Sequence, residues 1–164
     1  MLDFLIPNPP KHEVVVVETD DEKVCHRFEI QKISPDLVYL RVEERFMDCE
    51  LVTNYTLKLD EYVLKVVSCY MTGDTLEKVL LNAGYHYIRL PRTNDAQEFW
   101  EYMPDMQRKV KCVSKIDTDA QTSLRILHVS RVIEDLCLEE KGGFLVEEFY
   151  AEGIGLIKRI ETIF

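Results

Sequence analysis

The sequence predicts a mainly β fold: a strongly curved antiparallel sheet that forms a half-barrel, a barrel-like structure or a sandwich, with at most one or two short helices. Apolar and polar residues alternate along many short segments, which is the pattern of half-buried strands. Turn-forming residues separate these segments at the spacing of an antiparallel meander. The sequence contains no internal repeat that is longer than these strand-and-turn units. Its 164 residues are expected to form one domain, residues 1–164, with a sizeable core.

Turn signals and β-branched runs locate the strands one after another. Pro7-Asn8-Pro9-Pro10 is an irregular lead-in, because proline cannot donate to a strand ladder. Four consecutive valines, Val14 to Val17, favour a strand covered on both faces. Ser34-Pro35-Asp36 is a turn signal, because proline presets φ and aspartate bonds to its own backbone. The other predicted strands are residues 24–31, 38–46, 51–59, 62–70, 76–81, 85–90, 110–116, 123–133, 144–150 and 154–163.

The alternation also assigns side chains to the faces of the sheet, because successive strand residues point to opposite sides. In the fifth predicted strand, Leu64 and Val66 are expected to share a face with Ser68 and Tyr70. Cys69 is expected on the opposite face of that strand.

One segment breaks the strand rhythm. Apolar residues from Ala96 to Met103 recur at helical spacing, and Asp95 is a good N-cap for a helix. Phe99 and Trp100 also belong to an alternating pattern, which is typical of a strand. The local pattern favours a short helix over residues 95–103, and a strand is the alternative.

Composition limits the partners and the location of the protein. The formal net charge of −10, from 30 acidic and 20 basic residues, argues against a nucleic-acid-binding protein. No segment is long enough to form a transmembrane span. The first residues lack the basic region and the long apolar run of a signal peptide. The sequence as written therefore predicts a cytoplasmic protein; the alternative is an exported or cell-envelope protein whose signal was removed.

Cysteine and histidine spacing indicates no metal site and no disulfide framework. The five cysteines are an odd number and include no C-x-x-C pair, and the four histidines supply no closely spaced ligand pair. Most of the thiols fall in apolar strand-like runs, where cysteine acts as a small hydrophobic residue. We expect buried, reduced thiols, although the sequence does not determine their redox state. The cysteines are Cys25, Cys49, Cys69, Cys112 and Cys137.

No motif of a known catalytic site occurs, so the protein is expected not to be an enzyme and to use no cofactor. Gly153-Ile154-Gly155 lacks the third glycine and the following βαβ unit of a dinucleotide loop, so it is expected to mark a bulge. His26 is expected to be a core histidine. Glu147 and Glu148 are expected on a solvated face or loop. An unrecognised hydrolase would need a histidine and a carboxylate that converge in a cleft.

Aromatic residues are the strongest candidates for a binding site. They could line a concave, largely apolar pocket with a few hydroxyl groups as anchors. The alternative is that they only pack the sheet, and the composition favours this alternative. The candidate ligand-binding residues are Tyr55, Tyr62, Tyr70, Tyr87, Trp100 and Tyr102.

The least ordinary run of the chain is Phe149-Tyr150-Ala151-Glu152-Gly153-Ile154-Gly155-Leu156-Ile157-Lys158. It resembles the closing motif, Tyr-Ala-x-Gly-Ile/Val-Gly-Leu-Val/Ile-Lys, of a broad group of uncharacterised bacterial β-rich, lipoprotein-like domains. Leu90-Pro91 followed by Trp100-Glu101-Tyr102 is similar to a second step of that group. The resemblance lies mainly in the C-terminal half. The residues that carry the closing motif are Tyr150, Gly153, Gly155 and Lys158.

The resemblance implies a curved antiparallel sheet like the half-barrels of lipoprotein carriers, a strand at Trp100 to Tyr102, and no catalytic residue. This chain departs from the group in its five cysteines and in its first residues, which do not form a signal peptide. Export is therefore in doubt. Gly153 and Gly155 are expected to let the last strand bend or bulge.

These observations together predict a non-enzymatic binding domain. The concave face of the curved sheet would hold an apolar ligand or a segment of a partner protein. The alternative is a structural or self-assembly module that acts through an edge strand. The sequence determines neither the identity of the ligand or partner nor the oligomeric state.

Overall fold

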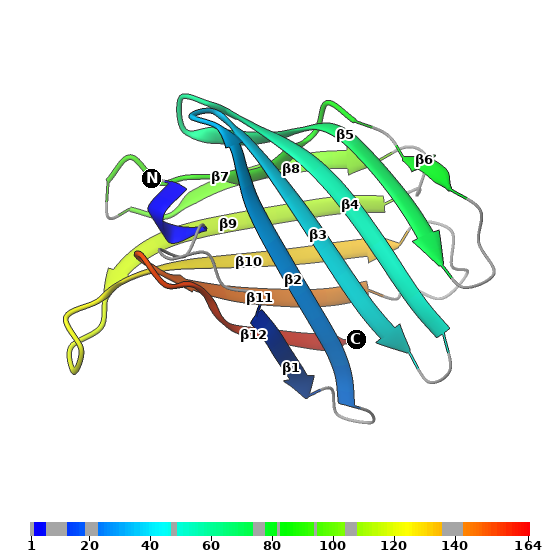
Figure 1. Ribbon diagram of the computed structural model, residues 1–164. Helices are drawn as coiled ribbons and strands as arrows, with labels where there is room; N and C mark the ends of the chain where they lie inside the picture. Colours follow the sequence, from blue (N-terminus) through cyan, green and yellow to red (C-terminus); the bar gives the residue numbers. More distant parts are fainter. Residues whose placement is uncertain are drawn as a thin grey trace.

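The computed structural model describes residues 2–5, 13–18, 23–46, 49–73, 78–81, 83–93, 95–103, 108–135 and 143–164. It is mainly β, with two antiparallel sheets and one short 3-10 helix, η1 (Leu2–Phe4) (Figure 1). The strands are β1 (Glu13–Glu18), β2 (Lys23–Ser34), β3 (Leu37–Phe46), β4 (Cys49–Asp60), β5 (Val63–Gly73), β6 (Val79–Leu81), β7 (His86–Arg89), β8 (Gln97–Met103), β9 (Arg108–Thr118), β10 (Arg125–Asp135), β11 (Gly143–Ala151) and β12 (Gly155–Ile163).

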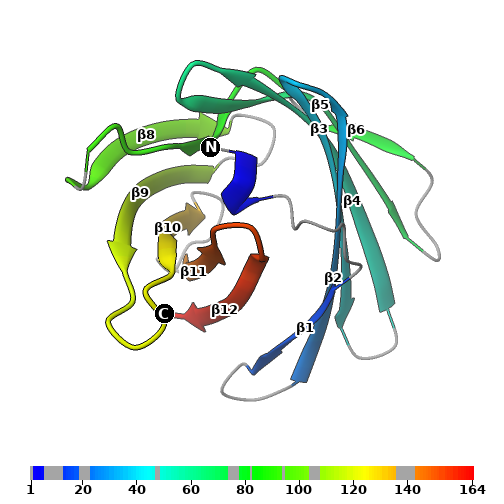
Figure 2. The same cartoon turned by 60° about the vertical axis from the view of Figure 1, so that its left-hand side comes forward.

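The strands follow one another through space nearly in chain order. Sheet A has the order β1-β2-β3-β4-β5-β6, with β7 also paired to β5. Sheet B has the order β12-β11-β10-β9-β8. The two sheets stand on opposite sides of a shared interior, and η1 lies between them near one end (Figure 2). They approach each other at both borders, where β1 lies near β12 and β7 lies near β8 and β9. The predicted mainly β, antiparallel fold is confirmed.

The inward faces of both sheets contribute to one hydrophobic core. Leu64 and Ile88 from sheet A and Leu127 and Val129 from sheet B are fully buried. Alternating strand residues supply this core, since every second side chain of a strand points to the same side.

The N-terminal helical turn covers one end of this interior. Phe4 and Leu5 are buried in the shared core. The backbone N–H of Gly153, in the turn between β11 and β12, donates to the carbonyl oxygen of Asp3 over 2.6 Å. The guanidinium of Arg125 lies 5.4 Å from the centre of the Phe4 ring. These contacts join η1 to sheet B.

Strand β7 joins sheet A to sheet B. It pairs with β5 on one side, and side chains of sheet B reach its carbonyl groups on the other. Arg131 Nη2 donates to the carbonyl oxygen of Tyr87 over 3.3 Å, and Ser114 Oγ donates to the carbonyl oxygen of Arg89. Buried polar side chains thus satisfy backbone groups that would otherwise form an open sheet edge.

The predicted helix at residues 95–103 is wrong, and the alternative, a strand, is what forms. β8 pairs with β9, and Phe99 lies opposite Cys112. Phe99 is buried and Trp100 is 47% exposed, as alternation in a half-buried strand requires. Pairing with β9 overrides the local helical spacing. Asp95 caps no helix; its carboxylate instead accepts a hydrogen bond from the hydroxyl of Thr93.

The predicted faces of β5 are wrong from Ser68 onward. An extra residue, Val67, interrupts the pairing of β5 with β4, and both Val67 and Ser68 are exposed. Burial resumes at Cys69, which the alternation placed on the outer face. A single inserted residue reverses the face of every later side chain, because strand side chains repeat every two residues. Tyr70 consequently lies on the outer face.

Most of the other predicted strands are confirmed, with boundaries that shift by a few residues. The Ser34-Pro35-Asp36 turn is also confirmed: it joins β2 to β3, and Ser34 Oγ donates to the Asp36 carboxylate over 2.7 Å. The predicted lead-in at Pro7 to Pro10 lies outside the described residues. So does the side chain of His26, although its backbone belongs to β2.

Candidate functional site

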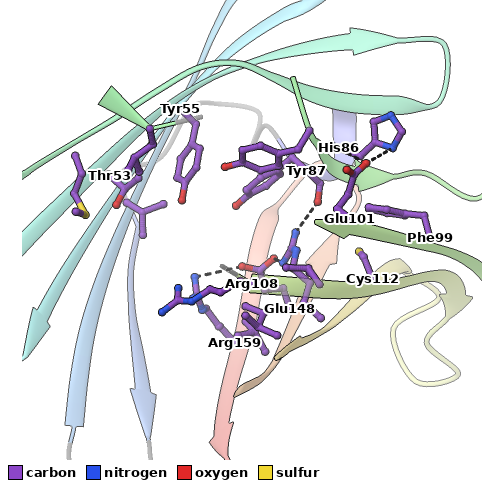
Figure 3. Close-up of a pocket in the computed structure, with 18 of the residues that line it drawn as sticks. Thr53, Tyr55, His86, Tyr87, Phe99, Glu101, Arg108, Cys112, Glu148 and Arg159 are labelled. Atoms are coloured by element: carbon purple, nitrogen blue, oxygen red, sulfur yellow. Dashed lines mark hydrogen bonds and ion pairs between the residues drawn. The ribbon is translucent and has the colours of Figure 1, made fainter. Parts of the chain in front are cut away.

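A cavity of about 270 Å³ lies between the two sheets (Figure 3). All the strands from β3 to β12 contribute to its lining. Its apolar lining consists of Val42, Leu51, Met71, Leu81, Phe99, Val110, Cys112, Ile133 and Val146. Its polar lining consists of Thr53, Tyr55, Tyr85, His86, Tyr87, Glu101, Arg108, Arg131, Glu148 and Arg159.

The polar lining includes a buried ion cluster on sheet B. Glu148 on β11 is 1% exposed and forms ion pairs with Arg131 on β10 and Arg159 on β12. Arg159 Nη1 lies 3.3 Å from Glu148 Oε1, and the Tyr150 hydroxyl donates to Glu148 Oε2 over 2.8 Å. Arg159 also forms an ion pair with Glu161. One carboxylate is therefore shared by two guanidinium groups, with a tyrosine hydroxyl as a third donor.

Electrostatic interactions keep both Glu148 and Arg131 ionised. Desolvation by burial raises the pKa of Glu148, but the charges of Arg131 and Arg159 outweigh it and the pKa is lowered overall. Burial alone would lower the pKa of Arg131, but the Glu148 charge raises it well above its usual value. Burial, followed by the Glu148 charge, raises the pKa of Tyr150. The cluster therefore holds fixed charges inside the protein.

A β-bulge brings Arg159 into this cluster. Phe149 pairs with Lys158, and Tyr150 pairs with Leu156, so Ile157 is an extra residue in β12. Leu156 is buried and Ile157 is exposed. Without the bulge, the face of Leu156 would continue at Lys158 and Arg159 would point outward.

A histidine–carboxylate pair forms another part of the cavity wall. His86 Nδ1 lies 2.9 Å from Glu101 Oε1, and the two side chains join β7 of sheet A to β8 of sheet B. The His86 backbone N–H also points at Glu101 Oε1, over 3.4 Å. The imidazole meets the Phe99 ring edge-on, with ring centres 5.6 Å apart. This arrangement fixes the imidazole at the seam between the two sheets.

Two cysteines lie in the same interior, one on each sheet. Cys69 and Cys112 are buried and carry free thiols, as predicted. Burial raises the pKa of Cys69 to about 11, and burial also raises the pKa of Cys112. These thiols are poor nucleophiles at neutral pH, because the thiolate is the reactive form. The side chains of Cys25, Cys49 and Cys137 lie outside the part that the structure describes.

The structure brings two of the six candidate aromatic residues into the cavity lining. Tyr55 on β4 and Tyr87 on β7 have ring centres 5.4 Å apart, with the rings tilted by 51° (Figure 3). Tyr62 packs against the core and carries Arg92 over its ring at 4.5 Å, in a separate surface groove. Tyr62 is therefore not part of the cavity.

The other candidate aromatic residues do not reach the cavity. Tyr70 lies on the outer face of sheet A, where Lys78 Nζ is 4.2 Å from its ring centre. Trp100 lies on the outer face of sheet B, where Lys109 Nζ is 4.3 Å from its ring centre. The side chain of Tyr102 is outside the described part of the structure.

The closing motif forms the turn between β11 and β12. Gly153 and Gly155 have φ angles of 76° and 92°, which glycine adopts without strain. Tyr150 is buried against Glu148, and exposed Lys158 lies 5.8 Å from the Phe149 ring centre. Tyr150 is therefore the residue of the motif that belongs to the ion cluster, and it does so from strand β11.

The sequence analysis does not identify the charged groups of the cavity as site residues. The prediction of a solvated surface is wrong for Glu148, which is buried, whereas its neighbour Glu147 is half-buried and contacts His128 at 3.0 Å. The signal was present in β11, where Val146, Glu148 and Tyr150 alternate on one face. A charged residue between two apolar residues of a buried face requires an ionic partner.

Neither a membrane-spanning helix nor a metal site is evident in the described residues. No helix there is long and apolar enough to cross a membrane. No three metal-ligating side chains come together among the residues searched. Comparison of the chain with protein-family models, with curated proteins and with solved structures found no match in any of the three.

Proposed function

We propose that the protein is a non-enzymatic binding domain whose inter-sheet cavity holds a small, largely apolar molecule. The observation that supports this most is the amphipathic lining: nine apolar or weakly polar side chains stand beside ten polar ones. Five of the polar groups are held by ion pairs, namely His86, Glu101, Arg131, Glu148 and Arg159. Ligand pockets are typically concave, mostly apolar and equipped with a few fixed polar groups. The same lining supports a small molecule better than a partner segment, which would need a longer groove.

We further propose that the two sheets act as one strongly curved wall around the ligand. The approach of β1 to β12 and of β7 to β8 and β9 supports this arrangement. The hydrogen bonds from Arg131 and Ser114 to the backbone of β7 would hold one border closed. The side chains of Tyr55 on β4 and Tyr87 on β7 would then contact the bound molecule.

The His86–Glu101 pair gives the best argument for the rival enzymatic function. A hydrolase needs a nucleophile next to such a pair. Cys112 also lines the cavity, but burial raises its pKa and makes it a poor nucleophile. The pair fits a structural role better, because it links β7 to β8.

The proposal can be tested on the purified protein. Native mass spectrometry should detect a co-purified small molecule, and titration with 1-heptanol should shift NMR signals of cavity-lining residues. The Val42→Phe variant fills part of the cavity and should weaken heptanol binding. The matched control is Val67→Phe, at an exposed position of β5, and it should bind normally. Equal binding by both variants would refute the assignment of the ligand to this cavity.

Self-assembly through an edge strand stays a prediction. Light scattering over a range of protein concentrations tests it directly. A strict monomer at high concentration would count against that function and would leave the binding proposal intact.

A further inference from the structure

We propose that the molecule bound in the cavity is uncharged and carries a neutral oxygen group, such as a hydroxyl or a carbonyl. The inference rests on the proposed binding function and adds the chemical class of the ligand. Two features of the cavity support it: the formal charges along its wall cancel, and the wall opposite the arginines carries hydroxyl groups.

The charged groups described in and beside the cavity wall balance one another. Three arginines and two carboxylates line the cavity, and a third carboxylate beside it forms an ion pair with one of the arginines. Three positive charges thus face three negative ones when the histidine of the lining is neutral. The six groups are Arg108, Arg131, Arg159, Glu101, Glu148 and Glu161.

Ion pairs within the protein hold most of these groups. Four of the six form one ion cluster, in which Glu148 is 1% exposed and is shared by Arg131 and Arg159. Glu101 Oε1 lies 2.9 Å from His86 Nδ1. A charged ligand would have to displace one of these partners or stay unpaired, and an unpaired charge in a buried site is strongly disfavoured. An uncharged ligand leaves every pair intact.

Neutral hydroxyl groups supply the polar contacts on the other side of the cavity. Thr53 and Tyr55 lie on β4 of sheet A, across the cavity from Arg108 (Figure 3). Tyr87 on β7 and Tyr85 just before it also line the cavity. Burial raises the pKa of Tyr85, so its hydroxyl keeps its proton at neutral pH. A hydroxyl both donates and accepts hydrogen bonds, so this wall suits an alcohol or a carbonyl compound better than an ion.

The cavity volume limits the size of the ligand. A volume of about 270 Å³ holds roughly nine groups the size of a water molecule, at ~30 Å³ each. 1-Heptanol, with seven carbons and one oxygen, matches this size. A much longer chain would not fit inside without an opening of the sheets.

The test compares three molecules that share one tail and differ in the charge of the head group. 1-Heptanol, heptanoate and heptylamine are titrated into the protein by calorimetry at pH 8, above the range in which histidine ordinarily takes up a proton. 1-Heptanol should bind at least about tenfold more tightly than either ion, because an unpaired charge costs far more to bury than a hydroxyl group.

Two pairs of variants identify the charge balance as the cause. Glu101→Gln removes one negative charge from the wall and should raise the affinity for heptanoate relative to 1-heptanol roughly tenfold. Glu98→Gln removes the same charge elsewhere on β8, where Glu98 pairs with Lys111, and should bind as the wild type does. Leu81→Lys adds a positive charge to the wall and should act like Glu101→Gln. Its matched control is Leu80→Lys, at a position of β6 that is 75% exposed.

The outcomes separate this inference from the proposed function. A thermal melt first establishes that each variant is folded. Equal or tighter binding of heptanoate or heptylamine by the wild type, or a co-purified ligand with a net charge, would overturn the inference and leave the binding function standing. An unchanged preference for 1-heptanol in folded Glu101→Gln and Leu81→Lys would do the same. Absence of binding by all three molecules to the wild type, with no co-purified ligand, would overturn both.

Discussion

Replacement of Glu148 by glutamine is expected to lower the free energy of unfolding by about 3 to 5 kcal/mol at pH 7. The magnitude follows from burial: Glu148 is 1% exposed and is paired with two arginines that are each 12% exposed. Glutamine has nearly the same shape, so packing is preserved, but it cannot neutralise Arg131 or Arg159. Two guanidinium groups would then remain charged in the interior without the carboxylate that they share.

The pH dependence provides a second signature of the same interaction. The folded-state pKa of Glu148 is lowered from its ordinary value of 4.5, after desolvation is outweighed by Arg131 and Arg159. A lowered pKa means that the carboxylate contributes stability above pH 4.5, and this contribution is lost as the pH falls through the folded-state pKa. The stability difference between wild type and Glu148→Gln should therefore shrink in acid.

Urea denaturation followed by circular dichroism measures both effects. Glu152→Gln is the matched control. Glu152 pairs with exposed Arg125, so this variant should lose at most about 1 kcal/mol of unfolding free energy. A Glu148→Gln variant whose unfolding free energy at pH 7 lies within 1 kcal/mol of the wild type, on the scale of an exposed ion pair, would refute this account of the cluster.

Two further substitutions and one chemical modification test the backbone and the core. Gly153→Val should lower the free energy of unfolding by about 1 to 3 kcal/mol, because Gly153 has a φ of 76° that valine adopts only with strain. Heptanol binding should be unaffected, and lost binding at an unchanged melting temperature would contradict this. Gly143→Ala should cost about 1 to 3 kcal/mol, because its Cβ would lie 2.7 Å from the carbonyl oxygen of Ile133; an unchanged urea midpoint would disprove the clash. Iodoacetamide at pH 8 should modify Cys69 and Cys112 slowly in the native protein and quickly in urea, as mass spectrometry can measure; equal rates would contradict their burial.

The strands could be predicted from the sequence because alternation records which side chains face the core. The segments around Leu40 and Val110 alternate clearly, and their inward residues are buried as expected. The structure of residues 95–103 was harder to predict, because Phe99 fits both a helical stripe and an alternating strand. Pairing of β8 with β9 decides between them, and that contact is not local in the sequence.

The candidate site was less predictable than the fold because its position depends on bulges. Tyr70 is a candidate as an aromatic residue, and unbroken alternation places it on the face of Leu64, but the extra residue Val67 turns it outward. Arg159 was overlooked for the converse reason, since the extra residue Ile157 turns it inward. Nothing in the local composition marks either position. Tyr55 lies on a strand segment whose inward pattern was regular, and it does line the cavity.

The bulge at Val67 also bears on how this chain can change in evolution. Deletion of this one residue would leave Cys69 and Met71 inside and Ser68 and Tyr70 outside, because β5 would then alternate regularly in the register that it already has with β4. The bulge therefore allows β5 to lose one residue here without any change in the side chains that form this wall of the cavity. A relative that lacks this one residue should therefore present the same β5 side chains to the cavity.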